Sequence, residues 1–98
     1  MDTNEVIEKL QQIKPYLQEK YAVKNVGLFG SFADGTHTEN SDVDIMVEFE
    51  YPIGWQFFTL EQYLEKTFNR KIDLVTVNAL KEQIKPLVLS QIQYIDAL

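Results

Sequence analysis

The 98-residue sequence contains no cysteine, and this absence excludes disulfide bonds, thiolate metal ligands and cysteine nucleophiles together. It also contains no run of about 18 apolar residues, so no transmembrane helix is expected. The acidic start, MDTNEVIEKL, lacks the basic and then apolar pattern of a secretory signal. Together these absences favour a cytoplasmic protein, and the chain length favours a single domain covering residues 1–98.

Positive charge is scarce where negative charge is dense. The formal net charge is −6, and residues 30–50 carry six carboxylates without one Lys or Arg. Proteins that attract a nucleic-acid backbone from a distance need a basic patch or stripe, whereas the nine basic residues of this chain are scattered. The composition therefore disfavours direct binding to nucleic acids.

Hydrophobic periodicity predicts an α+β domain with a small sheet, in the order helix, strand, short helix, strand, helix, strand and helix. The first helix is expected to begin at Asp2, with Glu5 as its capping-box partner, and to kink or restart at Pro15. The last helix is expected after Asn78 as N-cap, with Pro86 tolerable only in its first turn. The expected strands are residues 25–30, 41–49 and 71–77, and the middle helix has an apolar stripe of Phe57, Leu60, Leu64 and Phe68.

The strand SDVDIMVEF contains the most informative residues of the chain. Asp42 and Asp44 share one face of it, roughly 6.5 to 7 Å apart along the backbone. Ionised carboxylates held this close favour a shared proton or a bound cation, and Mg²⁺ prefers carboxylates combined with substrate phosphates. Asp73 interrupts an otherwise apolar strand and is the candidate third carboxylate of a two-metal site. A lone D-x-D is more often a solvated strand face, so the interpretation depends on its combination with Asp73 and the Gly30-Ser31 turn.

Two other phosphate or metal motifs are excluded by their missing residues. The G-x-x-x-x-G spacing imitates a P-loop, but Thr36 and His37 stand where Lys and Ser or Thr are required. A calcium loop beginning at Asn40 would need Gly at the position of Ile45 and Glu at the position of Tyr51.

The remaining pattern is Gly30-Ser31, a spacer and then SDVDIMV, and it resembles the nucleotidyltransferase fold of DNA polymerase β, specifically its minimal nucleotidyltransferases. The segments VEFEYPIGW, RKIDLVTVNALK and the C-terminal YI are similar to the subgroup of antitoxins that are paired with HEPN-domain toxins. The resemblance covers nearly the whole chain. It implies a small mixed β-sheet flanked by helices.

The resemblance also implies a role for each motif residue. Asp42, Asp44 and Asp73 would be the catalytic, Mg²⁺-binding residues, and Asp73 would favour deprotonation of the acceptor hydroxyl. Gly30 and Ser31 would hold the triphosphate of the nucleotide, ATP being the expected substrate. The acidic block would then be a metal site, because phosphates that arrive as a magnesium complex cancel the repulsion. The acceptor hydroxyl would attack the α-phosphorus and release pyrophosphate.

The resemblance implies that the acceptor belongs to a partner protein. In the family, AMP is transferred from ATP to a tyrosine of a HEPN-domain ribonuclease toxin, and this chain would be the antitoxin. A chain of this length can hardly hold an acceptor by itself. Relatives often carry basic residues just after the Gly-Ser pair, where this chain has Phe32 and Asp34. That difference leaves open a binding-only antitoxin that masks its partner, and transfer to a small molecule is a third hypothesis.

Three further side chains have two interpretations each. His37 either contacts a phosphate or partner or lies exposed in a loop, and exposure is the expectation. Trp55 either caps the following helix against the core or stands exposed. Arg70 either meets a phosphate or serves as a strand-edge charge that discourages aggregation.

Overall fold

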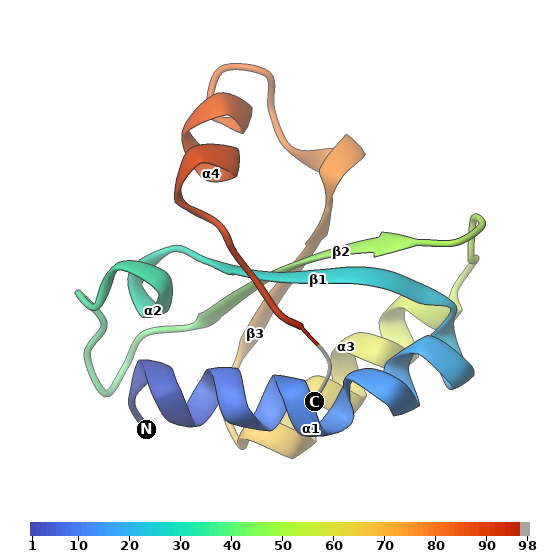
Figure 1. The fold of residues 1–98 in the computed structure, drawn as a ribbon, viewed down its shortest axis with the longest axis horizontal. Coiled ribbons are helices and arrows are strands. Elements are labelled where there is room, and N and C mark those ends of the chain that lie inside the picture. The colour runs from blue at the N-terminus through green and yellow to red at the C-terminus, as the bar shows by residue number, and fades with distance from the viewer. Residues whose placement is uncertain (97–98) are drawn as a thin grey trace.

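The computed structural model describes residues 1–96 and contains one four-stranded sheet in the order β3-β2-β1-β4 (Figure 1). Strand β2 runs parallel to β3, whereas β1 is antiparallel to both of its neighbours. The strands are β1 (Val23–Phe29), β2 (Val43–Phe49), β3 (Ile72–Thr76) and β4 (Gln93–Tyr94). The helices are α1 (Thr3–Tyr21), α2 (Ser31–Asp34), α3 (Gln56–Phe68), α4 (Lys85–Gln91) and the 3-10 helix η1 (Val77–Ala79). The predicted α+β class with a small mixed sheet is confirmed.

Helix α1 begins with the capping box that the sequence predicts. The Asp2 side chain accepts a hydrogen bond from the Glu5 backbone N–H at 2.9 Å, and the Glu5 side chain accepts one from the Asp2 N–H at 3.2 Å. The helix continues through Pro15 as one element, so the alternative of a restart there is wrong. Pro15 is exposed, and the carbonyl left without its usual N–H partner can therefore face water.

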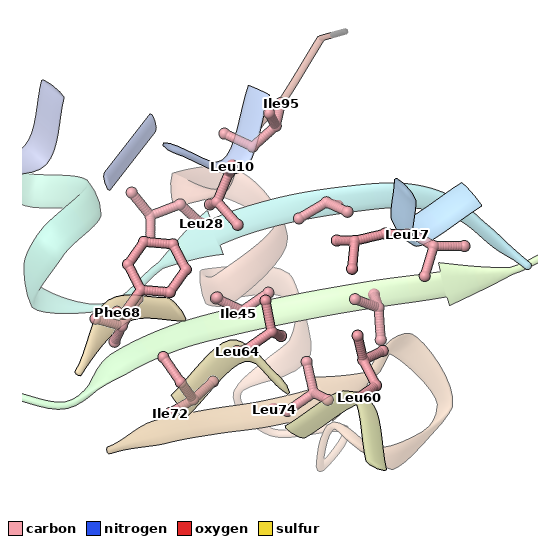
Figure 2. Close-up of a cluster of buried hydrophobic side chains, with 14 of the residues drawn as sticks. Leu10, Leu17, Leu28, Ile45, Leu60, Leu64, Phe68, Ile72, Leu74 and Ile95 are labelled. Carbon is pink, nitrogen blue, oxygen red and sulfur yellow. The ribbon is translucent and has the colours of Figure 1, made fainter. Parts of the chain in front are cut away.

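The hydrophobic core lies between the sheet and the pair α1 and α3 (Figure 2). Figure 1 shows these two helices together on one side of the sheet and α4 on the other. The fully buried members include Leu10, Leu17, Leu28, Ile45, Leu60 and Leu64. Burying a side chain of this size contributes about 1.5–3 kcal/mol relative to leaving it exposed. This layer therefore fixes β1 and β2, the strands from which the candidate site is built.

The opposite face of the sheet is partly covered by the segment that follows α4. Ile92 packs against Gly27 of β1, where an added Cβ would lie 2.6 Å from Ile92 Cγ1. Met46, the partner of Gly27 in β2, is 1% exposed. Strand β2 is therefore buried on both faces at its centre, although its alternating pattern predicted one buried face only.

The C-terminal region differs from the prediction in two respects. Asn78 lies inside η1 and does not cap the last helix, which begins at Lys85 with Pro86 in its first turn. Strand β4 was not predicted, because two residues are too few to show a period. Lys14 of α1 is buried and donates a hydrogen bond from Nζ to the Ile95 carbonyl at 2.6 Å, which ties this region to α1. No helix of residues 1–96 has the length and apolar character that a membrane span requires.

Candidate active site

The predicted phosphate turn connects β1 to α2, and its shape depends on Gly30. Gly30 has φ +70° and ψ −153°, a backbone region that is essentially restricted to glycine. Its carbonyl accepts hydrogen bonds from the N–H groups of Ala33 at 3.0 Å and Asp34 at 3.2 Å, which closes the first turn of α2. Ser31 is the first residue of that helix and is half-buried. The turn therefore places Gly30 and Ser31 directly at the end of β1.

The carboxylate of Asp44 lies against this turn. A Cβ built on Gly30 would be 2.9 Å from Asp44 Cγ and closer still to its Oδ2. The register explains the approach, because Asp44 of β2 is opposite Phe29, the residue before Gly30. Asp44 therefore occupies space that is free only because residue 30 has no side chain.

Asp44 is also opposite Asp73 in the parallel pairing of β2 with β3. The two side chains leave the same face of the sheet at neighbouring positions, and Asp44 is half-buried while Asp73 is exposed. Asp42 is half-buried and directly precedes β2. The third-strand aspartate that the sequence singled out is thus next to the D-x-D segment, although Asp44 and Asp73 are 29 positions apart along the chain.

The electrostatics of the cluster centre on Asp44, whose pKa is raised to about 6. Burial is the largest cause, followed by the charge of Asp73, a hydrogen bond between the Asp44 and Asp73 carboxyl groups, and the charge of Asp42. Each cause penalises ionised Asp44 or favours its protonated form. The protein therefore holds three carboxyl groups whose mutual repulsion a divalent cation would relieve.

In residues 1–96, no group of three or more His, Asp or Glu side chains is arranged closely enough to hold a metal ion as it stands. The structure brings Asp44 together with Gly30 and Asp73, and Asp42 acts on Asp44 through its charge. The donor set nevertheless fits Mg²⁺, which takes one or two carboxylates and completes its shell with water and substrate phosphates. The metal-binding and nucleotide-binding roles of these residues remain predictions.

The three side chains with open interpretations now have defined positions. His37 is half-buried and stacks on Phe32 with ring centroids 4.1 Å apart and planes 11° apart, so the expectation of an exposed loop histidine is wrong. Trp55 is 79% exposed and does not cap α3 against the core. Arg70 donates a hydrogen bond to the Ser41 carbonyl and is not a free strand-edge charge.

One contact near the site has no signal in the sequence. The Gln93 side chain of β4 donates a hydrogen bond from Nε2 to the Ala33 carbonyl of α2 at 2.6 Å. Sixty positions separate the two residues, and no local pattern links them. The C-terminal strand therefore supports the short helix that follows the phosphate turn.

Comparison with known proteins points to the same family as the sequence motifs. Residues 11–95 match the family model described as polymerase beta, nucleotidyltransferase. The protein adenylyltransferase MntA of Thermococcus cleftensis is 41% identical over 94 residues, which cover 91% of this chain and 95% of MntA.

Two solved structures illustrate the fold. One, assigned to the minimal nucleotidyltransferases, has a TM-score of 0.78 and 26% identity, with 95% of each chain covered. Another comes from the complex of a tri-AMPylated Shewanella oneidensis HEPN toxin with its MNT antitoxin, and it has a TM-score of 0.61 and 21% identity over 98% of this chain and 70% of that one. The family match covers most of the chain and includes the Gly-Ser turn and all three aspartates, so this protein belongs to the polymerase β nucleotidyltransferase family.

Proposed function

We propose that this chain is a protein adenylyltransferase that transfers AMP from ATP to a tyrosine hydroxyl of a HEPN-domain ribonuclease toxin, and that it acts as the antitoxin of that toxin. The proposal rests mainly on one observation: Asp44 lies opposite Asp73 in the sheet and against the Gly30 turn. The 41% identity to MntA of Thermococcus cleftensis, along nearly the whole chain, supports a protein as the acceptor.

Asp42, Asp44 and Asp73 would hold Mg²⁺, which would neutralise the phosphates and stabilise the charge that develops on the reacting oxygens. The Gly30 and Ser31 N–H groups and the Ser31 hydroxyl would bind the triphosphate. Asp73 is exposed, so it can receive the proton of an acceptor hydroxyl that approaches from solvent. The acceptor oxygen forms a bond to the α-phosphorus, the bond from that phosphorus to the bridging oxygen breaks, and pyrophosphate leaves.

The raised pKa of Asp44 agrees with this assignment. Burial and, after it, the neighbouring carboxylates penalise the ionised Asp44 carboxyl group and raise its pKa, and a bound divalent cation would compensate this charge. Residues 30–50 contain no Lys or Arg, so a bound divalent cation would help to bring a triphosphate to this acidic block.

The partner is proposed from the resemblance to the antitoxin subgroup and from the relatives. The Shewanella oneidensis protein of the same fold is the antitoxin of a HEPN toxin that carries AMP groups. For this chain, we propose a HEPN-domain toxin that presents a tyrosine to the exposed side of Asp73.

The test is incubation of the chain with α-phosphate-labelled ATP, Mg²⁺ and the candidate toxin, followed by detection of label on each protein. Wild type should label a tyrosine of the toxin. Asp44→Asn should not, and the matched control Glu39→Gln should label it normally, because Glu39 is an exposed carboxylate of the same acidic block. A tight complex that gains no label with wild type would refute the transferase and leave a binding-only antitoxin.

A further inference from the structure

Arg70 is the only arginine of the chain, and its guanidinium is bonded to the segment that leads into the D-x-D motif. Its Nη1 donates a hydrogen bond to the Ser41 carbonyl at 3.1 Å. Ser41 directly precedes Asp42, so this bond fixes the backbone where the carboxylate segment enters β2. The side chain is half-buried, which shields the bond from competing water.

The same guanidinium lies over the ring of Phe32, 5.3 Å from its centroid. Phe32 is 0% exposed and follows Ser31 in α2, so its ring is a fixed part of the helix that begins at the phosphate turn. Its carbonyl also accepts a hydrogen bond from the Thr3 hydroxyl of α1 at 2.6 Å. Arg70 therefore touches a well-anchored residue on one side and the D-x-D segment on the other.

The backbone next to Arg70 continues toward the third aspartate. The Lys71 carbonyl accepts a hydrogen bond from the Val43 N–H at 3.1 Å, and the parallel pairing that follows places Asp73 opposite Asp44. Arg70 thus lies where the phosphate turn, the D-x-D segment and the start of β3 meet. We infer that Arg70 is a positioning residue, which holds the phosphate turn and the carboxylate segment at the separation that the transfer reaction requires.

Arginine suits this place better than lysine would. A planar guanidinium can stack on an aromatic ring and donate a hydrogen bond in its plane at the same time, whereas an ammonium is a compact, strongly hydrated point charge. The inference rests on the proposed function, because the separation matters only where a nucleotide bridges the two segments. Displacing a substrate-binding or catalytic group by about 1 Å can lower the reaction rate about 100-fold.

The first measurement is hydrogen–deuterium exchange of residues 38–43 in the free protein, for wild type, Arg70→Met and Arg70→Lys. Arg70→Met should raise the exchange rate of this segment about tenfold, because it removes the hydrogen bond to Ser41 and the cation–π contact with Phe32 while retaining an apolar stem. Lys71→Met is the matched control, since Lys71 is a neighbouring exposed cation, and it should leave the rate unchanged. Unchanged exchange in Arg70→Met would overturn the inference.

The second measurement separates positioning from direct contact with phosphate. Arg70→Met should lower kcat of AMP transfer about tenfold or more and change KM for ATP by less than about threefold. A raised KM with unchanged kcat would instead make Arg70 a phosphate ligand and would overturn the positioning role. Arg70→Lys should recover only part of kcat, and full recovery would contradict the need for a guanidinium that contacts Phe32 and Ser41 at the same time.

The two measurements also distinguish this inference from the proposed function. Exchange is measured without ATP or toxin, so it tests the Arg70 contacts even if wild type transfers no AMP. Absent transfer by wild type would refute the proposed function. Transfer by wild type and Arg70→Met at the same rate would refute the positioning role alone.

Discussion

Replacing Gly30 with alanine should damage both stability and activity, because two separate penalties act at this position. Gly30 occupies a backbone region that is essentially restricted to glycine, and placing another residue there costs about 1–3 kcal/mol. The new Cβ would also overlap the Asp44 carboxyl group, and overpacking of this kind typically costs about 1–3 kcal/mol more. The sum, about 2–6 kcal/mol, is a large part of the stability of a small domain, about 5–15 kcal/mol.

Gly35→Ala supplies a matched control with only one of these penalties. Gly35 ends α2 with φ +80° and ψ 8°, and a Cβ there meets no atom within 4 Å. This left-handed conformation costs a non-glycine residue about 1–2 kcal/mol. Gly35→Ala should therefore lose less stability than Gly30→Ala and should keep its AMP-transfer activity.

The comparison is made by thermal unfolding and by the labelling assay. In a domain of this size each kcal/mol lowers Tm by about 4–8 °C, so the two variants should be clearly separated. Gly30→Ala should also lose about 100-fold in transfer rate at a temperature where it is folded, because the Asp44 carboxyl group is displaced. Equal losses of Tm and of activity in the two variants would refute the close approach of Asp44 to the turn.

Two further predictions concern the side chains of Asp44, which is half-buried, and Lys14, which is buried. Burial and neighbouring carboxylates raise the pKa of Asp44 to about 6, so between about pH 4 and pH 6 the folded protein binds a proton that the unfolded chain has released. In the absence of divalent metal, wild-type Tm should therefore fall as pH rises through this window. Asp44→Asn should lack that fall and should melt higher than wild type above it; identical pH profiles would contradict the raised pKa. Lys14→Met should lower the free energy of unfolding in urea by about 1–3 kcal/mol, because the Ile95 carbonyl loses its buried partner. The exposed control Lys20→Met should stay within about 0.5 kcal/mol of wild type, and an equally small change in Lys14→Met would show that this bond adds little.

Most of the local structure could be predicted because it depends on short-range chemistry. The Asp2 capping box starts α1, and alternating side chains define β2. The prediction failed at Asn78, which entered a 3-10 helix instead of capping α4. Of the two outcomes expected at Pro15, the restart did not occur, because the exposed side of α1 faces water there.

The candidate site, too, could be predicted from the sequence only in part. The sequence supplied the residue types, since the spacing of Gly30-Ser31 and the D-x-D pair is local and Asp73 is a charged residue in an otherwise apolar strand. The sequence could not supply the contact of Arg70 with Phe32, which joins positions far apart along the chain. His37 lies only five positions after Phe32, but no local pattern predicts that their rings stack.

By itself, the sequence determined the α+β class, the order of most elements and the chemical character of the acidic block. Tertiary structure alone decided that Asp44 lies against Gly30 and opposite Asp73, and that Arg70 spans from Phe32 to Ser41. The physical reason is the range of the interactions. Capping, alternation and turn geometry act within a few residues, whereas strand register and side-chain contacts between elements exist only after the core has aligned the sheet.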